Sequence, residues 1–594
     1  MSALLEITNL NVHFALADGD VHAVKDASLS IQESECLGVV GESGSGKSQL
    51  FLAAFGLLAA NGHATGSVKY RGEEILGAPP RRLNALRGGA VTMIFQDPLT
   101  SLTPHMKIGA QITEALMLHR KISRAEALTR AREMLDYVRI PESARRLRQY
   151  PHELSGGMRQ RVMIAMATIT GPDLIIADEP TTALDVTVQA QILEILRALK
   201  TDKKTAIAMV SHDMGVIAGL ADRVQVMRHG EIVESGSADE IFYAPRHAYT
   251  RMLLDSIPKA DEMPSPVTAI GAPLLTVDDL KVTFPVKDKG LFGKTRLLRA
   301  VDGVSFILHQ GETLGVVGES GCGKSTLARA VLQLLPKSGG RVVWLGRDLD
   351  AQTQSDIRKL REDFQIVFQD PLASLDPRMP VGVSIAEPLK ALEPHLSREA
   401  VRDRVRAIMS RVGLEPGWIN RYPHELSGGQ NQRVGLARAM IVGPKMLVCD
   451  EAVSALDVSI QAQIVELIRD LQAETGLALI FISHDLSVVR RLSHRVMVLY
   501  LGRVVELAPS AALYSAPRHP YTRALLSAVL TPDPRAERLR KRELLTGDLP
   551  SPLDPRAQLT FLKSKLGLKS RPDGPEYRPK LEQVAPDHFV AEHD

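Results

Sequence analysis

Residues 41–48 read GESGSGKS, and residues 318–325 read GESGCGKS. A continuous apolar run precedes each stretch, CLGVV in the first case and TLGVV in the second. In the spacing Gly-x-x-x-x-Gly-Lys-Ser, glycines let successive backbone N–H groups point into a loop, and the helix that follows presents its positive end to phosphate. The sequence therefore predicts two phosphate-binding loops, each between a buried strand and a helix.

The two loops belong to an internal repeat that covers most of the 594 residues. Lys47 and Lys324 lie 277 positions apart (324 − 47 = 277), and from Ser155 onward the copies keep an offset of 272 (427 − 155 = 272). A solenoid would need a period of roughly 20–50 residues, so the pattern favours two tandem homologous domains. The expected parts are a first domain (1–257), a Pro-rich linker (258–275), a second domain (276–530) and a C-terminal tail without cysteines (531–594).

The charge balance argues against a nucleic-acid partner. The chain has 72 Lys and Arg residues against 69 Asp and Glu, a net charge of +3, and only 4% aromatic residues. Nucleic-acid binding proteins usually carry a basic patch and aromatic side chains on which bases stack. The basic run RAERLRKRE (535–543) is expected to be a solvated helix face rather than a lipid-binding patch.

No segment predicts a membrane span or a signal peptide. The most apolar stretch, LFLAAFGLLAA (50–60), is shorter than the about 20 residues that cross a bilayer. The N-terminus lacks a basic stretch followed by an apolar one. The three cysteines lie far apart with no CxxC pair, which argues against a zinc or disulfide framework and indicates a reducing compartment.

Further apolar runs indicate the fold class. LIIAD (174–178) and MLVCD (446–450) are continuous rather than alternating, and AIAMVSHD (206–213) and LIFISHD (479–485) end on the same three residues. Continuous runs of this kind are typical of central parallel strands with helices on both faces. We therefore predict an α/β fold with two tandem P-loop domains, each with a parallel-sheet core.

An acidic pair ends one of these runs in each copy, Asp178-Glu179 and Asp450-Glu451. Such pairs are common as solvated ends of strands, but behind a phosphate-binding loop they supply the second half of a nucleotide site. The aspartate would hold Mg²⁺ through water, and the glutamate would polarise the attacking water.

Three more motifs occur once in each copy and carry a resemblance to ABC ATPases. LSGGMRQ (154–160) and LSGGQNQ (426–432) resemble the signature motif of that family, and the FQDP stretches at 95–98 and 368–371 resemble its Q-loop. The histidine of each SHD resembles the switch histidine, although a lone histidine can equally be a core residue. The resemblance implies ATP and Mg²⁺ as ligands, and in each domain an antiparallel β subdomain and a helical subdomain beside the parallel sheet.

The resemblance also implies that each ATP site is shared, because the signature helix of one domain faces the nucleotide of the other. The first site would combine Lys47, Ser48, Gln96, Asp178, Glu179 and His212 with Ser427, Gly428 and Gly429. The second would combine Lys324, Ser325, Gln369, Asp450, Glu451 and His484 with Ser155, Gly156 and Gly157.

The implied roles are repeated in the two copies. The expected catalytic residues are Glu179, His212, Glu451 and His484, and the expected Mg²⁺ ligands are Ser48, Gln96, Asp178, Ser325, Gln369 and Asp450. The remaining nucleotide-binding positions are those of the two loops, Gly41, Glu42, Ser43, Gly44, Ser45 and Gly46, and Gly318, Glu319, Ser320, Gly321, Cys322 and Gly323. Because neither copy has lost its glutamate or histidine, we predict two competent sites.

The segments between the motifs narrow the class. FQDPLTSLTPHMKIG (95–109) and FQDPLASLDPRMPVG (368–382) extend the Q-loop in a way that resembles peptide/nickel importers. APRHAYTRMLL (244–254) and APRHPYTRALL (516–526) resemble the His-Pro-Tyr element that follows each ATPase core in that family, although Ala248 replaces the proline. Ala452 in place of the usual proline, the fusion of two domains and LLTGDLPS (544–551) resemble the ATP-binding subunits of glutathione importers, while other dipeptides or oligopeptides stay open.

The sequence thus predicts the energy-coupling subunit of a bacterial importer at the cytoplasmic face of the inner membrane. The implied partners are two transmembrane permease subunits and, indirectly, a periplasmic binding protein. A tandem ABC ATPase acting on ribosomes would carry a long charged linker, and a DNA-repair ATPase would carry coiled-coil or zinc insertions; this chain has neither. A nickel or other-solute importer remains an alternative. An exporter does too, because importers and exporters use the same kind of ATPase domains.

Overall fold

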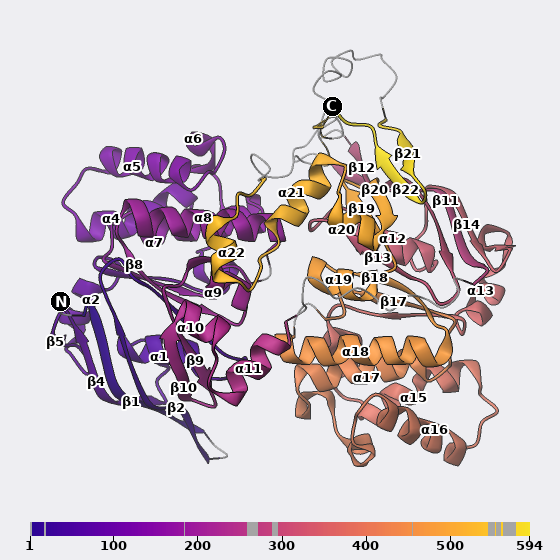
Figure 1. The fold of residues 1–594 in the computed structure, drawn as a ribbon, viewed down its shortest axis with the longest axis horizontal. Coiled ribbons are helices and arrows are strands. Elements are labelled where there is room, and N and C mark those ends of the chain that lie inside the picture. The colour runs from indigo at the N-terminus through magenta and orange to yellow at the C-terminus, as the bar shows by residue number, and fades with distance from the viewer. Residues whose placement is uncertain are drawn as a thin grey trace. The chain divides into compact units, whose positions relative to one another are not determined.

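The computed structural model describes residues 3–16, 19–182, 184–257, 271–287, 295–453, 456–543, 553, 557, 560–561 and 578–594. The stretch LLTGDLPS and most of the expected linker lie outside these residues. The chain divides into two compact units, Met1–Ile257 with Ala528–Gly547 and Pro258–Ser527 with Asp548–Asp594 (Figure 1). The domain boundaries expected from the repeat stay predictions.

The core of the first unit is a six-stranded sheet in the order β10-β9-β3-β8-β7-β6. Its strands are β3 (Cys36–Val40), β6 (Val91–Ile94), β7 (Leu174–Asp178), β8 (Ala206–Ser211), β9 (Arg223–Arg228) and β10 (Glu231–Ser237). All pairs are parallel except β9–β10. Every residue of β3, β7 and β8 is buried, as expected for strands covered on both faces, and the predicted α/β class is confirmed.

A smaller antiparallel sheet covers one side of this core in the order β2-β1-β4-β5. Its strands are β1 (Leu5–Leu16), β2 (Gly19–Ile31), β4 (Gly62–Tyr70) and β5 (Glu73–Glu74). Along β1, Leu5 and Ile7 are buried whereas Glu6 and Thr8 are exposed, so one face of the sheet packs inward. The helix that follows the first phosphate-binding loop, α1 (Lys47–Ala54), contributes Phe51 to the same hydrophobic cluster.

The helices of the first unit begin and end at positions that the sequence marks. They are α1, α2 (Pro80–Leu86), α3 (Pro98–Ser101), α4 (Ile108–His119), α5 (Arg124–Tyr137), α6 (Ser143–Arg146), α7 (Gly156–Thr168), α8 (Val186–Asp202), α9 (Met214–Leu220), α10 (Ala238–Tyr243) and α11 (Ala248–Asp255). Ser123 caps α5 by accepting a hydrogen bond from the Glu126 N–H, and Ser237 with Glu240 forms a capping box on α10.

The second unit repeats this plan with a larger main sheet, in the order β16-β17-β18-β13-β19-β20-β22-β21. Its strands are β13 (Thr313–Val317), β16 (Phe364–Val367), β17 (Met446–Asp450), β18 (Ala478–Ile482), β19 (Arg495–Tyr500), β20 (Arg503–Pro509), β21 (Leu581–Ala585) and β22 (His588–Ala591). The small sheet has β11 (Pro273–Lys287), β12 (Thr295–His309), β14 (Gly339–Trp344) and β15 (Arg347–Asp348). The hairpin β21–β22 comes from the C-terminal tail and has no counterpart in the first unit's main sheet.

The helices of the second unit follow the same sequence of elements. They are α12 (Lys324–Val331), α13 (Gln354–Leu360), α14 (Pro371–Ser374), α15 (Val381–Leu392), α16 (Arg398–Arg411), α17 (Gly428–Met440), α18 (Val458–Thr475), α19 (Leu486–Leu492), α20 (Ser510–Ser515) and α21 (Pro520–Ala528). The last helix, α22 (Pro534–Leu539), lies in the first unit although it follows the second in sequence (Figure 1).

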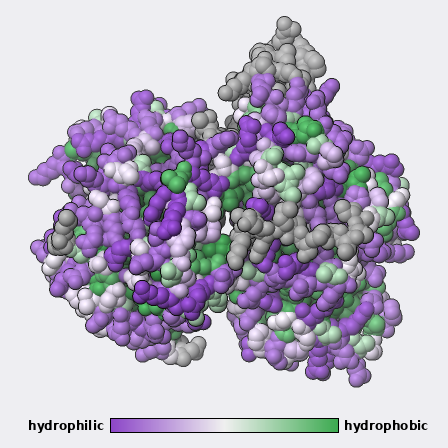
Figure 2. Space-filling model, in the orientation of Figure 1, coloured by the Kyte–Doolittle hydropathy of each residue, from purple (hydrophilic) through white to green (hydrophobic). Residues whose placement is uncertain are grey.

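One face of the molecule is drawn in Figure 2, and the described residues on it are largely polar. On the face drawn in Figure 2, hydrophilic residues cover most of each unit and hydrophobic residues appear in small groups. Among the described residues, no helix combines the length and the apolar character that a membrane crossing requires.

Candidate active sites

In each unit the predicted site residues follow neighbouring parallel strands of the main sheet. In the first unit, the phosphate-binding loop follows β3, the SHD histidine follows β8, the acidic pair ends β7 and the Q-loop glutamine follows β6. These four strands are adjacent in the order β3-β8-β7-β6, and in the second unit β13-β18-β17-β16 repeat the arrangement. Because parallel strands end at one edge of a sheet, segments far apart in sequence meet there.

The first phosphate-binding loop depends on a glycine directly before α1. Gly46 has φ +95°, and a Cβ added to it would lie 2.4 Å from the carbonyl oxygen of Ala23. The buried Lys47 turns its Nζ back into the loop and donates hydrogen bonds to the carbonyl oxygens of Gly41 at 2.8 Å and Glu42 at 2.9 Å. Only a residue without a side chain fits at Gly46 without a shift of the backbone.

The second loop repeats this geometry. Gly323 has φ +107°, and its added Cβ would lie 2.1 Å from the carbonyl oxygen of Ala300. Lys324 donates to the carbonyl oxygens of Gly318 at 2.7 Å and Glu319 at 3.2 Å. The two lysines thus donate to the carbonyl oxygens of equivalent loop residues in the two copies.

The serine after each lysine contacts the aspartate at the end of the neighbouring acidic strand. Ser48 Oγ donates to Asp178 Oδ1 at 2.9 Å, and Ser325 Oγ donates to Asp450 Oδ1 at 2.7 Å. Burial raises the pKa of both aspartates above its ordinary value, and the serine hydrogen bonds lower it again in part. Hydroxyl and carboxylate oxygens held this close are donors of the type that Mg²⁺ prefers.

The glutamate that follows each aspartate has an unusual backbone. Glu179 has φ 47° and Glu451 has φ 51°, values that L-residues other than Asn and Asp adopt at some cost. Such strained positions concentrate at functional sites, where the surrounding structure holds a side chain in one direction. In each copy the glutamine of the Q-loop donates to this glutamate, Gln96 to Glu179 at 2.8 Å and Gln369 to Glu451 at 2.7 Å.

The SHD histidines face the same two glutamates. His212 Nδ1 lies 3.1 Å from Glu179 Oε1, whereas His484 Nδ1 lies 3.7 Å from Glu451 Oε2. The neighbouring carboxylate raises the pKa of each histidine, and burial lowers it in part.

The two glutamates titrate below their ordinary range. Burial raises the pKa of Glu179, but hydrogen bonds from His212 and Thr182 and the charges of His212 and Lys47 together lower it below its ordinary value. At Glu451 the contact with His484 is the largest influence and lowers the pKa. Both glutamates are therefore deprotonated near neutral pH, as a group that accepts a proton from water must be.

The signature motifs begin helices, as the resemblance implies. Ser155 caps α7 by accepting a hydrogen bond from the Met158 N–H at 3.2 Å, and Ser427 caps α17 through the Gln430 N–H at 3.3 Å. The two glycines after each serine form the first turn, Gly156 and Gly157 in one copy and Gly428 and Gly429 in the other. Their expected position opposite the nucleotide of the other unit stays a prediction.

Two tyrosines contact the phosphate-binding loops and were not predicted from the sequence. Tyr249 Oη accepts a hydrogen bond from the Glu42 N–H at 3.2 Å, and Tyr521 Oη accepts one from the Glu319 N–H at 3.1 Å. Both tyrosines are buried and belong to the His-x-Tyr elements after the two cores. The only sequence signal was the repetition of that element.

Comparison with known proteins places the chain in a family. The protein-family model described as "ABC transporter" matches residues 24–182 and 301–454. A second family model, "Oligopeptide/dipeptide transporter, C-terminal region", matches residues 233–275 and 505–557. The chain therefore belongs to the ABC transporter family and is an ABC-type, ATP-binding ATPase.

Particular relatives align over nearly the whole chain. The glutathione import ATP-binding protein GsiA of Pectobacterium atrosepticum is 45% identical over 99% of this chain and 97% of that protein. The protein of the same name from Escherichia coli strain K12 is 44% identical over 99% of this chain and 97% of its own length. A solved dimeric ATP-binding cassette, MJ0796 bound to ADP and Pi, is 26% identical and covers 39% of this chain and 98% of its own, with a TM-score of 0.36.

Proposed function

We propose that this chain is the energy-coupling subunit of a bacterial importer for small peptides and that it hydrolyses ATP at two composite sites. The observation that carries the proposal is that glutamine, aspartate, glutamate and histidine lie at the carboxyl ends of the same three strands in both units. An inactive copy would have no need to keep the strained glutamate or its partners.

The mechanism assigns each side chain a step. The loop N–H groups and Lys47 bind the phosphates, while Ser48 and Asp178 would hold Mg²⁺, which would neutralise charge on the phosphates when bound. Glu179 accepts a proton from the attacking water, and His212 orients this glutamate and contacts the terminal phosphate. The corresponding groups of the second unit, Lys324, Ser325, Asp450, Glu451 and His484, act in the same way.

The two glutamines connect hydrolysis to the partners. Gln96 and Gln369 bond to the catalytic glutamates in this structure, so their loops respond to the state of each site. The partners are two permease subunits whose cytoplasmic helices contact these loops, and a periplasmic binding protein delivers the substrate. The chain then works at the cytoplasmic face of the inner membrane.

Glutathione is the substrate that the relatives' names favour. The match of the oligopeptide/dipeptide C-terminal region supports the wider class of small peptides. Since the ATPase subunit does not contact the transported molecule, the direct test is to purify the chain with its permeases and binding protein and to identify the bound ligand by mass spectrometry. Recovery of nickel or a non-peptide solute instead of a peptide would overturn the substrate assignment.

The two-site proposal is tested by exchanging each glutamate separately. Glu179→Gln and Glu451→Gln keep the shape of the side chain but remove the proton acceptor, so each is expected to lower ATP turnover by at least tenfold. The exposed Glu231, which pairs with Lys25, provides a matched control as Glu231→Gln. Wild-type turnover in either active-site variant would contradict the assignment of two competent sites.

A further inference from the structure

The segment after the second cassette folds onto the first. Residues Ala528–Gly547 belong to the first compact unit, and α22 within this segment packs against α9 and α10. In Figure 1, α22 appears in the colour of the late chain beside these two helices. The chain therefore leaves the second unit after Ser527 and returns to it at Asp548.

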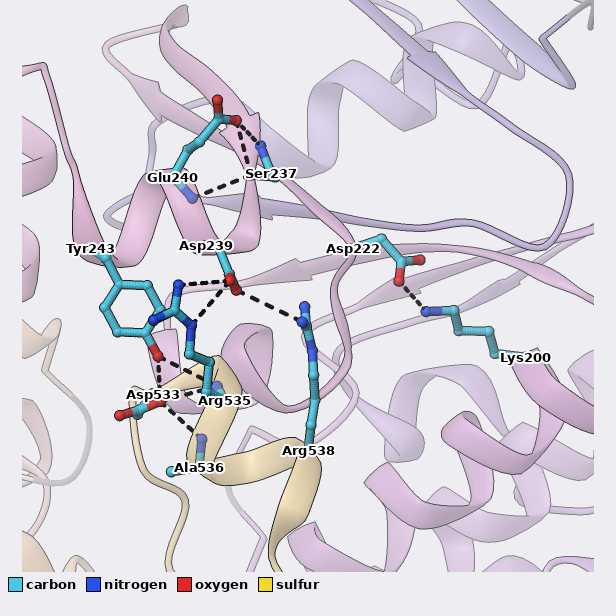
Figure 3. A network of polar contacts seen from close by, with 10 residues as sticks. All are labelled: Lys200, Asp222, Ser237, Asp239, Glu240, Tyr243, Asp533, Arg535, Ala536 and Arg538. Carbon is cyan, nitrogen blue, oxygen red and sulfur yellow. Dashed lines mark hydrogen bonds and ion pairs between the residues drawn. The ribbon is translucent and has the colours of Figure 1, made fainter.

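A polar network joins this segment to α10, as Figure 3 shows. Tyr243 Oη donates to Asp533, and the Arg535 guanidinium lies 4.3 Å from the centre of the Tyr243 ring. Arg535 also pairs with Asp239 at 3.1 Å, and Arg538 lies 3.7 Å from the same carboxylate. One aspartate and one tyrosine of α10 thus bind three polar side chains of the segment, Asp533, Arg535 and Arg538.

The segment has a buried ionic centre of its own. Glu537 is fully buried, accepts a hydrogen bond from the Thr531 N–H at 2.9 Å and pairs with Arg540 at 3.2 Å and with Arg542. The expectation that residues 535–543 form a solvated helix face is therefore wrong at Glu537 and Arg542. The sequence did not show this because α22 packs against α9 and α10, which lie far earlier in the chain.

The apolar contact of the segment is with the helix that follows the switch histidine. A Cβ added at Gly215, in the first turn of α9, would lie 2.8 Å from Leu530 Cβ. Asp213, directly after His212, caps the same turn by accepting a hydrogen bond from the Gly215 N–H at 2.8 Å. The position of Leu530 is thus coupled by one turn of helix to the histidine that faces Glu179.

The second copy lacks the residues that make this surface. At the offset of 272 (484 − 212 = 272), Ser487 stands for Gly215, Ala511 for Asp239 and Ser515 for Tyr243. Ser487 has the side chain that Leu530 would meet, and Ala511 and Ser515 offer neither the charge nor the ring that bind Arg535. The surface is specific to the first cassette.

We propose that residues 530–538 form a brace for the first ATP site. By docking on Gly215, Asp239 and Tyr243, the brace holds α9 and the turn of His212 in place, so the two ATP sites are supported unequally. This inference rests on the proposed role of His212 in hydrolysis. The brace residues are positioning residues, because they act through α9 and do not reach the nucleotide.

The test reverses one charge in the full-length chain. Arg535→Glu places a carboxylate beside Asp239 at an exposed position where it does not threaten the fold. The expected result is a kcat for ATP lowered at least twofold with an unchanged KM, and faster amide exchange in α9 but not in α19. Because Arg538 also faces Asp239, combining it with Asp239→Arg and Arg538→Glu reverses every charge of this contact and should restore both properties. Arg406→Glu, an exposed arginine of α16, is the charge-matched control.

Two further combinations separate this inference from the function on which it rests. With His212→Ala the charge reversal should cause no additional loss, whereas with His484→Ala it should cause its full loss. If His212→Ala alone leaves turnover unchanged, the role of the histidine is wrong, and amide exchange in α9 still decides whether the brace exists. Unchanged exchange in α9, or failure of the triple charge reversal to restore it, would overturn the brace.

Discussion

The tyrosines beneath the phosphate-binding loops allow a quantitative prediction. Tyr249→Phe removes the hydroxyl that accepts the Glu42 N–H at 3.2 Å, and Tyr521→Phe removes the one that accepts the Glu319 N–H at 3.1 Å. Both rings are at most 2% exposed, so phenylalanine keeps their packing. The change therefore removes the hydroxyl that accepts this hydrogen bond and leaves the ring in place.

The free-energy cost of each substitution depends on what happens to the backbone N–H of Glu42 or Glu319 once the hydroxyl is removed. Losing a typical hydrogen bond costs about 0.5–1.5 kcal/mol, and leaving a buried donor unpaired costs about 1–3 kcal/mol. If this cost falls on the ordering of the loop around phosphate, 1 kcal/mol weakens ATP binding about fivefold, since 1.4 kcal/mol is a factor of ten. Each single variant should raise the Kd for ATP at its own site about three- to tenfold.

The assay is calorimetric titration of ATP into the Glu179→Gln, Glu451→Gln chain, with and without each tyrosine change. Tyr70→Phe is the control, because it removes a hydroxyl that bonds to Asp173 at 2.6 Å at a place outside the loops. The reasoning is refuted if both loop variants bind ATP as tightly as their parent, or if Tyr70→Phe weakens binding equally.

Two further predictions concern stability and loop geometry. His519 is buried, and this burial, with His593 and Arg523 nearby, lowers its pKa from 6.5 to about 3. Between these two pH values the unfolded chain binds a proton at His519 and the folded chain does not. The unfolding free energy should fall by about 1.4 kcal/mol per pH unit below pH 6.5. Chemical denaturation at several pH values measures it, and the unfolding free energy should depend less on pH in His519→Gln but not in the matched control His247→Gln. Gly46→Ala would force the backbone near Ala23 apart and should abolish ATP binding at the first loop, so that titration finds one ATP per chain instead of two, whereas Gly435→Ala, whose added Cβ has 4.0 Å of space, should leave both.

Local patterns were sufficient to predict the core and the two loops. The runs ending at Asp178 and Asp450 became β7 and β17 because continuous apolar residues are stable only when a sheet is covered on both faces. The site residues could be grouped for a related reason, since parallel strands bring their carboxyl ends to one edge.

The parts that the sequence did not reveal depend on contacts between distant segments. The Tyr249 hydroxyl meets a loop 207 residues earlier, and nothing in the neighbourhood of Tyr249 indicates that partner. The hairpin β21–β22 joins the main sheet through Glu506 and Leu507, and His588 bonds to Glu506 at 2.8 Å. The composition of the tail is typical of a solvated segment. The hairpin β21–β22 is ordered by tertiary packing, which the composition does not indicate.

The proposal that each ATP site is composite, with residues from both units, is tested most directly by counting the ATP molecules bound per chain. In the Glu179→Gln, Glu451→Gln chain, in which we expect ATP to be hydrolysed slowly, equilibrium dialysis should find two ATP molecules per chain. Adding Ser427→Glu places a carboxylate at the start of α17, where it would face the phosphates held by the first unit, and should reduce the number to one. Two molecules in the presence of Ser427→Glu, or a single one in its absence, would contradict the account.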